Sequence, residues 1–357
     1  MWFATEDGLN RFDGYDFDVY NSDETDTSSL SSNSVWAVFE DSDQNLWIGT
    51  EKGLNLYLRE KEKFLHFHHI PGSNKTLSHP VVSDVVEDGR GNLWVATRGG
   101  GINVFNKKTK AFRYFSAHPE KEDSLTVDEV VLLYKDRAGY IWAGTEGGGL
   151  CKYDHVQKKF IRYVYEPHNP ESLSQNQIRA IIEDDQGFFW IGTEEGGLNR
   201  FDPKTKTFKR YNSANSGIVD NSIRSLYIDT QGKFWIGTDY GINLFNRESG
   251  EFILYEHEPN KMHSLCNNHV LSIYEDEAGV LWFGTWGGGI SKFDRYKQKF
   301  IHFKADANDP QSLSNNSVRG FCQDSEGYIW IGTDNGLNKF DREKEIFRHY
   351  KYSPDDP

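Results

Sequence analysis

The sequence has few sulfur-containing residues and no long apolar run. Its 357 residues include three cysteines and two methionines. Cys151, Cys266 and Cys322 are an odd and scattered set, and two of them fall inside strand patterns, so we expect buried free thiols rather than a disulfide framework. No apolar stretch approaches the roughly 18 residues that a membrane-spanning helix needs. We therefore expect neither a disulfide-stapled domain nor a membrane helix within this sequence.

Positive charge is also in short supply. Lys and Arg number 40 against 54 Asp and Glu, which gives a formal net charge of −14. This balance argues against nucleic acid or an anionic membrane surface as a partner, because both would be repelled. Aromatic residues, by contrast, make up 15% of the chain, as expected of sheets built from Trp, Tyr, Phe, Val and Ile.

One tryptophan motif, here called the cassette, recurs along the whole chain. It is Trp-Ile-Gly-Thr at 47–50, 190–193, 235–238 and 330–333, with close variants at 2–5, 94–97, 142–145 and 282–285. Successive cassette tryptophans lie 45 to 48 residues apart, and a period in the forties predicts one supersecondary unit per repeat within a single domain over 1–357. The chain begins inside a cassette, with no room for a signal peptide, so we expect it to be a fragment of a longer protein. The repeats run near 1–33, 34–80, 81–127, 128–176, 177–221, 222–268, 269–316 and 317–357.

Each complete repeat predicts four short strands. In the second repeat, strands are expected at 34–41, 46–50, 54–58 and 64–68, with polar or glycine-containing turns between them. The pattern predicts an all-β fold, a β-propeller of four-stranded antiparallel blades, with seven complete repeats and one partial N-terminal repeat. Seven and eight blades are both compatible with this count. The cassette tryptophan is expected to be the aromatic wedge packed between neighbouring blades.

The repeat closely resembles the two-component regulator propeller repeat. The resemblance rests on the pattern Glu-Asp-x-x-Gly-x-Leu-Trp-Ile-Gly-Thr-x-x-Gly-Leu-Asn-x-Phe-Asp, on Gly-Leu-Asn-Arg-Phe-Asp-Gly-Tyr at 8–15, and on the linker-like segment 308–318. Such propellers form the periplasmic sensor region of hybrid histidine kinases and some diguanylate cyclases. The resemblance implies a periplasmic location, a downstream β-sandwich and membrane-anchored signalling domain as partners, a homodimer, and in several members a response to glycan fragments. It supplies no catalytic residue and no cofactor.

Two columns of variable residues are expected on one face of the propeller, which we call the linker-side face. Strand order places the starts of the first strands and the second-to-third turns on the face crossed by the long inter-blade linkers, and functional residues concentrate in such loops. The first column, near the start of the first strand, contains Trp36, Ser83, Val131, Arg179, Arg224, Leu271 and Arg319. The second column, directly after the cassette threonine, contains Glu6, Glu51, Arg98, Glu146, Glu194, Asp239, Trp286 and Asp334.

These columns supply the candidate ligand-binding residues. Tryptophan rings could stack on the apolar face of a sugar, while charged side chains bond its hydroxyls, and several arginines could hold a uronate or a sulfate. The alternative is that the arginines pair with neighbouring acidic residues in a solvated channel mouth. Trp286, flanked by glycines on a turn, is the strongest candidate. The candidate set is Trp286, Trp36, Arg98, Arg179, Arg224, Arg319, Asp239 and Glu194.

Metal and catalytic chemistry are weakly indicated. His66 and His68 would share a strand face, but no acidic or cysteine ligand completes a set. Asp41, Asp43 and Asn45 are similar to a calcium loop that lacks the glycine and the glutamate which such loops need. We predict no metal, no cofactor and no enzymatic activity of the chain itself. The leading hypothesis is a sensor that binds a small molecule, plausibly an oligosaccharide; a protein-interaction scaffold is the alternative, followed by a carbohydrate-active enzyme.

Overall fold

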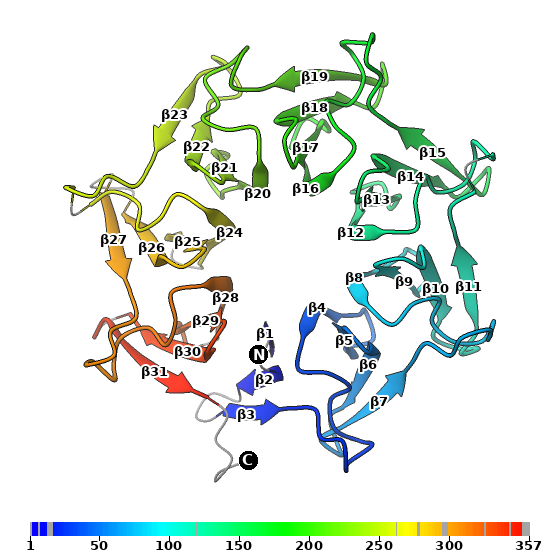
Figure 1. The fold of residues 1–357 in the computed structure, drawn as a ribbon, viewed down its shortest axis with the longest axis horizontal. Coiled ribbons are helices and arrows are strands. Elements are labelled where there is room, and N and C mark those ends of the chain that lie inside the picture. The colour runs from blue at the N-terminus through cyan, green and yellow to red at the C-terminus, as the bar shows by residue number, and fades with distance from the viewer. Residues whose placement is uncertain are drawn as a thin grey trace. The chain divides into compact units, whose positions relative to one another are not determined.

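The computed structural model describes residues 2–5, 8–12, 17–118, 120–261, 263–276, 279–294, 299–324, 326–342 and 344–351. Its regular elements are all β-strands, arranged as one three-stranded sheet and seven four-stranded sheets. In every sheet the strands are hydrogen-bonded to one another in chain order (Figure 1). The predicted all-β fold of four-stranded propeller blades is confirmed, and β1–β3 form the partial N-terminal repeat. Within the described ranges there is no helix of the length and apolar character needed to cross a membrane.

The chain divides into two compact units. Unit 1 comprises Met1–Val19, Glu194–Leu198 and Tyr211–Pro357, and unit 2 comprises Tyr20–Thr193 and Asn199–Arg210. The strands that lie wholly or mainly in unit 2 are β4 (Val35–Glu40), β5 (Leu46–Thr50), β6 (Gly53–Leu58), β7 (Lys63–Phe67), β8 (Val82–Glu87), β9 (Asn92–Thr97), β10 (Ile102–Asn106), β11 (Phe112–Phe115), β12 (Val130–Lys135), β13 (Ile141–Thr145), β14 (Leu150–Asp154), β15 (Lys159–Tyr163), β16 (Ile178–Glu183), β17 (Phe189–Thr193), β18 (Leu198–Asp202) and β19 (Thr207–Tyr211).

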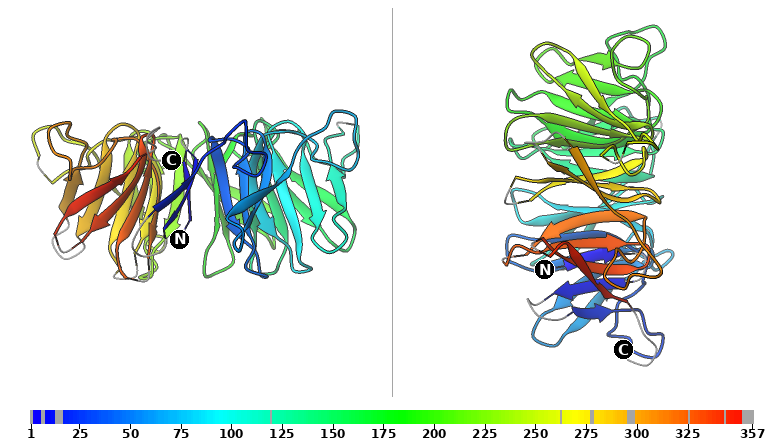
Figure 2. Two further views of the ribbon diagram at one scale, coloured as in Figure 1. Left: turned by 90° about the horizontal axis from the view of Figure 1, so that it is seen from below. Right: turned by 90° about the vertical axis from the view of Figure 1, so that its left-hand side faces the viewer.

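Unit 1 holds the remaining sheets. Its strands are β1 (Trp2–Thr5), β2 (Gly8–Phe12), β3 (Phe17–Tyr20), β20 (Ile223–Ile228), β21 (Phe234–Thr238), β22 (Gly241–Phe245), β23 (Phe252–Tyr255), β24 (Val270–Glu275), β25 (Leu281–Thr285), β26 (Gly289–Asp294), β27 (Lys299–Phe303), β28 (Val318–Gln323), β29 (Ile329–Thr333), β30 (Gly336–Asp341) and β31 (Ile346–Tyr350). Inside each unit neighbouring sheets pack face to face (Figure 2), and their first strands lie side by side, as β4 does with β8 and β20 does with β24.

The cassette forms the core between sheets. Six of the seven second strands of the four-stranded sheets are buried along their whole length, and β9 is buried from its second residue, Leu93, onward. Their tryptophans are at most 2% exposed, which confirms the predicted wedge. Each indole Nε1–H donates to Oδ2 of the aspartate six residues earlier, at 2.7 to 3.0 Å. The pairs are Trp47–Asp41, Trp94–Asp88, Trp142–Asp136, Trp190–Asp184, Trp235–Asp229, Trp282–Asp276 and Trp330–Asp324.

The same aspartates organise the first turn of each sheet. In the second four-stranded sheet, Asp88 Oδ1 accepts hydrogen bonds from the backbone N–H groups of Arg90 and Asn92. Burial alone would raise the pKa of Asp88, but the hydrogen bonds from Asn92, Trp94 and Arg90 outweigh it and hold this pKa below its usual value. The spacing Asp-x-x-Gly-x-x-Trp therefore serves both the hairpin and the core, which the turn chemistry alone does not reveal.

The three cysteines are free thiols, as predicted. Cys151 and Cys266 are buried, and Cys322 is half-buried. Burial raises the pKa of each thiol. Their protonated, packed state is that of small core residues.

Asp84, on the first strand β8, gives the fold a pH dependence that can be measured. Its two carboxylate oxygens accept the N–H groups of Val85 and Leu133, both at 2.8 Å, and burial raises its pKa from 3.8 to about 6. Because the folded state binds this proton more tightly, Asp84's contribution to stability is largest below about pH 4 and is lost as the pH rises to about 6. We expect urea unfolding to show this loss, about 3 kcal/mol, as a change in the stability difference between the wild type and Asp84→Asn. The Asp84→Asn variant should lack it, and an unchanged pH profile in that variant would contradict the assignment.

Candidate functional site

A β-bulge in the first strand of every four-stranded sheet sets the first column. Each of these strands pairs with its neighbour up to one residue, skips the next and resumes pairing one position later. A bulged residue takes no part in the ladder, and bulges commonly redirect side chains beside functional sites. The skipped residues, here called the bulge positions, are Trp36, Ser83, Val131, Arg179, Arg224, Leu271 and Arg319.

The second column is fixed next to the first by the cassette threonine. Thr285 is fully buried, and its hydroxyl donates to the carbonyl of Gly289, which closes the second-to-third turn. The following residue, Trp286, donates its backbone N–H to the carbonyl of His269, two residues before the bulge position Leu271. The same backbone bond joins Glu51 to Ser34, Arg98 to Val81, Glu146 to Glu129 and Asp334 to Ser317. The two columns are therefore adjacent in these sheets, as predicted for the linker-side face.

The linkers are anchored close to these columns. In the last sheet the amide of Asn338, on β30, accepts the N–H of Ser314 and donates to the hydroxyl of the same serine. Asn55 with Ser31, Asn103 with Ser78, and Asn199 with Ser174 repeat this pair of hydrogen bonds. Because fully or nearly buried asparagines hold the linkers, the loops that surround the columns start from fixed points.

In unit 1 the two columns form a continuous chain of side-chain contacts. Arg224 links two acidic members of this chain. Its Nε and Nη2 donate to both carboxylate oxygens of Asp239, each at 2.7 Å, and its Nη1 donates to Glu194 at 2.8 Å. These three side chains are about one-fifth exposed, and the hydrogen bonds to Asp239, acting against burial, raise the pKa of Arg224. The guanidinium is thus a fixed element of the site.

The chain of contacts continues to an exposed tryptophan. Asp239 Oδ1 lies 2.9 Å from Nε2 of His269, whose ring centroid lies 5.8 Å from that of Trp286. The guanidinium carbon of Arg319 also lies 5.0 Å from the Trp286 ring centroid, and Arg319 Nε donates to Asp334 at 2.6 Å. Trp286 is nevertheless 51% exposed. A large aromatic ring is therefore held at the surface between a histidine and an arginine.

Two further residues of this site lie outside the candidate set. His269 links Asp239 to Trp286, and Tyr240, in the same turn as Asp239, is 63% exposed. A comparison of aligned repeat positions passes over both, because His269 precedes the bulge position by two residues and Tyr240 follows the second column by one. The signal that could identify Tyr240 is an aromatic residue within a turn whose other members are polar or glycine.

Unit 2 contains a second, smaller cluster of column residues. Arg98 lies over the ring of Trp36, which is 46% exposed, with the guanidinium carbon 4.7 Å from the ring centroid. Arg179 donates two hydrogen bonds to Glu146, at 2.5 and 2.9 Å. Burial alone would raise the pKa of Glu146, but Arg179 outweighs it, with smaller help from Gln177 and Arg98, and holds the pKa below its usual value. Arg98 Nε is buried and has no hydrogen-bond partner among the described residues.

The structure thus brings the predicted residues together within each unit. Unit 1 joins Glu194, Arg224, Asp239, Trp286 and Arg319, and unit 2 pairs Trp36 with Arg98 and Arg179 with Glu146. Arg179, Arg224 and Arg319 all pair with acidic residues, so the pairing considered as the alternative is present. Whether the columns contact a ligand stays a prediction. Glu6, the first member of the second column, lies outside the described residues.

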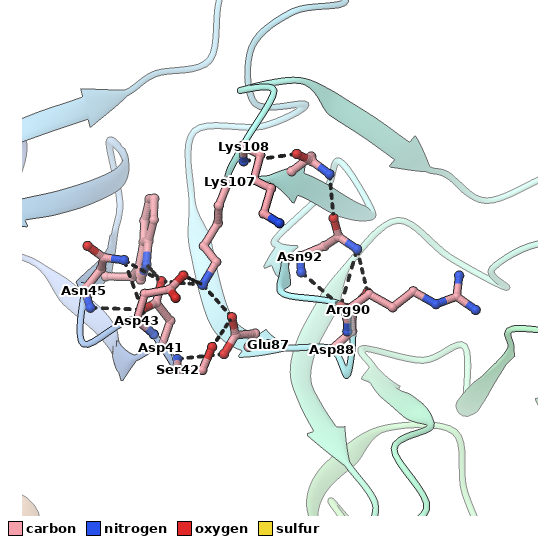
Figure 3. A network of polar contacts seen from close by, with 12 residues as sticks. Asp41, Ser42, Asp43, Asn45, Glu87, Asp88, Arg90, Asn92, Lys107 and Lys108 are labelled. Atoms are coloured by element: carbon pink, nitrogen blue, oxygen red, sulfur yellow. Dashed lines mark hydrogen bonds and ion pairs between the residues drawn. The ribbon is translucent and has the colours of Figure 1, made fainter.

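The calcium-like loop is neutralised by a lysine of the next sheet. Lys107 Nζ lies 3.0 Å from Asp41, 2.7 Å from Asp43 and 2.5 Å from Glu87 (Figure 3). These three carboxylates converge closely enough to hold a cation. The ammonium group supplies that charge, and despite the cost of burial its bonds to Asp43, Glu87 and Asp41 raise the pKa of Lys107. This arrangement links two sheets and places the ammonium group where the three carboxylates converge.

His66 and His68, the possible metal ligands, and their neighbour His69 contact backbone carbonyls. His66 Nε2 lies 2.5 Å from the carbonyl oxygen of Ser29, His68 Nδ1 lies 3.2 Å from that of Lys52, and His69 Nδ1 lies 2.7 Å from that of Leu77. Burial, the largest cause, lowers the pKa of His66. Each side chain ties the outer strand or its linker to a neighbouring segment.

Comparison with known proteins identifies the repeat and several similar proteins. The two component regulator propeller model matches residues 29–52, 76–99, 172–195, 217–240, 264–287 and 312–335. The chain is similar to the extracellular domain of the hybrid two component system BT3049 from B. thetaiotaomicron, with 28% identity, a TM-score of 0.66, and coverage of 98% of this chain and 45% of that one. It is 33% identical over 84 residues to histidine kinase P4 of Formosa agariphila, a match that covers 23% of this chain and 6% of that protein.

A third relative shows the fold alone. PorZ, a surface component of the type-IX secretion system of Porphyromonas gingivalis, has 17% identity and a TM-score of 0.65, with coverage of 93% of this chain and 49% of that one. The chain therefore spans less than half the length of each of these relatives. The sequence matches one repeat model at six places. The four-stranded sheets of the structure agree with these sequence matches. Six segments of the chain are therefore two component regulator propeller repeats.

Proposed function

We propose that this chain is the ligand-sensing ectodomain of a bacterial signal-transduction receptor and that it binds a neutral oligosaccharide at the linker-side face of unit 1. The observation that carries the proposal is Trp286, a half-exposed indole held between His269 and Arg319 in a continuous polar chain. Burying a large exposed aromatic ring against an apolar face contributes free energy to binding. The apolar face of a pyranose ring fits this surface, and Tyr240 in a nearby turn offers a second one.

The charges of the site favour a neutral saccharide over a uronate or a sulfate. In unit 1 the columns present two guanidiniums, Arg224 and Arg319, and three carboxylates, those of Glu194, Asp239 and Asp334. Each guanidinium is already bonded to a carboxylate. An anionic sugar would have to compete with those carboxylates and would be repelled by them. Hydroxyl groups, which both donate and accept, can add to paired charges without displacing them.

The same pairing supports binding rather than hydrolysis. A glycosidase needs one carboxylic acid and one free carboxylate on either side of the scissile bond. Glu194, Asp239 and Asp334 each accept a hydrogen bond from an arginine, so their oxygens are already engaged in ion pairs. We therefore assign the chain a recognition role, with the downstream output supplied by other parts of the receptor.

The signalling step is proposed from the relatives. The similar domain in B. thetaiotaomicron is extracellular and belongs to a hybrid two component system. We place this chain outside the cytoplasm, in the periplasm, ahead of a β-sandwich and a membrane-anchored kinase or cyclase domain, in a receptor that works as a homodimer. Ligand binding would favour one orientation of the propeller within the dimer and so shift the equilibrium of the output domain.

A thermal-shift screen tests the ligand class. The purified chain is mixed with neutral host, plant and algal oligosaccharides and with uronate-containing counterparts. A ligand that binds only the folded state raises the melting temperature, and at about 100 times its Kd it stabilises by about 2.7 kcal/mol. We expect a rise with a neutral compound in the wild type and none with Trp286→Ala.

The control is Ile253→Ala. Ile253 is 53% exposed on β23, and its loss should leave both the stability and the ligand response unchanged. A response that survives in Trp286→Ala, or that arises only with uronates, would contradict the proposed site. A well-folded chain without any response would shift the assignment to a face that binds a polypeptide.

A further inference from the structure

A pocket lies in unit 2, away from both columns, between the sheet β8–β11 and the sheet β12–β15. It encloses about 280 Å³ beside the first turns and the third-to-fourth turns of these sheets. The floor contains Trp94 and Tyr153, which are 1% and 3% exposed, together with Val104 and Phe112. The remaining lining residues are Asp88, Arg90, Asn92, Asn106, Ala111, Arg113, His155 and Lys158.

The rim of this pocket is cationic in a protein with a net charge of −14. Arg90, Arg113 and Lys158 are exposed, and within the described ranges none of them forms an ion pair. The guanidinium of Arg90 extends away from the Lys107 network (Figure 3). Arg113 lies over the ring of Phe115, with its guanidinium carbon 4.7 Å from the centroid, and keeps its N–H groups available.

The acidic lining residue cannot neutralise this rim. Asp88 is buried, and its two oxygens already accept hydrogen bonds from Trp94, from Asn92 and from the N–H of Arg90. The carboxylate of Asp88 therefore forms its hydrogen bonds with the core tryptophan and with the hairpin. Arg90, Arg113 and Lys158 are exposed at the rim around this buried carboxylate.

The internal repeats show how the pocket arises. Between the sheets β4–β7 and β8–β11, the corresponding place is filled: Lys107 crosses it to meet Asp41, Asp43 and Glu87. One repeat later, Arg90 stands at the position of Asp43, Lys135 at that of Glu87, and His155 at that of Lys107. Cationic residues thus stand at two positions that hold carboxylates in the preceding repeat. The shorter side chain of His155 stands where a lysine would fill the space.

His155 also turns back from the space that Lys107 would occupy. Its ring stacks on Tyr140, with centroids 5.6 Å apart, and its Nε2 lies 3.1 Å from the carbonyl of Gly139 in its own sheet. In unit 1 the equivalent residue Arg342 again reaches the preceding sheet, with Nη1 3.3 Å from Asp276. The open, cationic pocket is thus a local departure from the pattern at two other sheet contacts.

From this geometry we infer that the pocket between β8–β11 and β12–β15 binds a small organic anion, a carboxylate or sulfate carried on a ring. The rim guanidiniums match the paired oxygens of such a group, which arginine binds bidentately. Phe112, the half-buried member of the apolar floor, is the aromatic side chain on which the ring can pack. This ligand differs in charge from the neutral saccharide proposed for unit 1, and the inference does not depend on that proposal.

Isothermal titration with glucuronate, with glucose as its neutral match and inorganic sulfate as the bare anion, tests this inference. We expect saturable binding of glucuronate to the wild type, weaker binding of sulfate, and none of glucose. The double variant Arg90→Ala, Arg113→Ala should lose about tenfold or more in affinity, and added salt should weaken binding in the wild type. Because both arginines are exposed, the variant should unfold at the wild-type urea concentration.

Two further variants separate this site from the other proposal. Trp286→Ala should bind glucuronate like the wild type, and Lys108→Ala, an exposed lysine outside the lining, should do the same. Equal affinity for glucuronate and glucose, unchanged affinity in the double variant, or no binding of glucuronate would each overturn the inference. Loss of neutral oligosaccharide binding in Trp286→Ala would concern the site in unit 1 and not this pocket.

Discussion

Replacing Trp282 by alanine is expected to lower the free energy of unfolding by about 4 kcal/mol. The side chain is fully buried against Phe321 and Phe340, with ring centroids 6.3 and 5.5 Å away, so its removal opens a cavity between two sheets of unit 1. The change also deprives buried Asp276 of the indole N–H that it accepts at 2.8 Å. Urea unfolding followed by circular dichroism measures the loss.

The matched variant is Trp286→Ala, four residues along the same chain segment. Trp286 is half-exposed, so its replacement should cost under about 0.5 kcal/mol. Trp282→Phe keeps one aromatic ring but removes the donor and part of the ring volume; we expect a smaller cost than for alanine, about 2 kcal/mol. Equal effects of Trp282→Ala and Trp286→Ala on stability would show that the cassette tryptophan is not the wedge between sheets.

Replacing Lys107 by methionine is expected to be the most damaging single change of charge, at about 2 to 3 kcal/mol at neutral pH. The variant leaves three converging carboxylates without their cation, and two of them, Asp41 and Glu87, are almost fully buried. The raised pKa of Lys107 means that its contribution is fully present below about pH 10.5 and is lost at higher pH. Thermal and urea unfolding of both proteins measure the difference.

The pH dependence of that difference identifies its cause. In Lys107→Met the carboxylates repel one another until they take up protons, so the deficit relative to the wild type should shrink as the pH falls toward 4. Adding Glu87→Gln to Lys107→Met should recover part of the loss, whereas Lys108→Met, at an exposed neighbouring position, should have no effect. A deficit that is independent of pH and of Glu87 would mean that the aliphatic stem of Lys107, not its charge, stabilises the sheet contact.

The repeat pattern predicts the fold well because local and global signals agree. The turn residues, the alternating strands and the cassette all recur in every repeat, and the observed sheets follow them. The columns were also found from the sequence, because the bulge falls at the same place in each first strand and leaves one position free to vary. Variation against a constant background was a usable signal.

The partners within the site were not predictable in the same way. Arg224 bonds Asp239 in its own sheet and Glu194 in the preceding repeat, and Arg179 bonds Glu146 in the preceding repeat. The choice depends on distances that arise only when sheets pack. Lys107 is a clearer case, since it neutralises Asp41 and Asp43 from more than 60 residues away. The calcium-like spacing in the sequence gives no hint of that lysine.

The β-bulge of the first strand has a consequence for how such receptors diversify. Since the bulge residue takes no part in the ladder, its side chain can change without altering the strand pairing, and the seven positions hold Trp, Ser, Val, Leu and three Arg. Each repeat thus carries one evolvable site on a robust scaffold. New specificities can be explored by single substitutions, and a combinatorial library limited to these positions could reprogram recognition without redesigning a single strand.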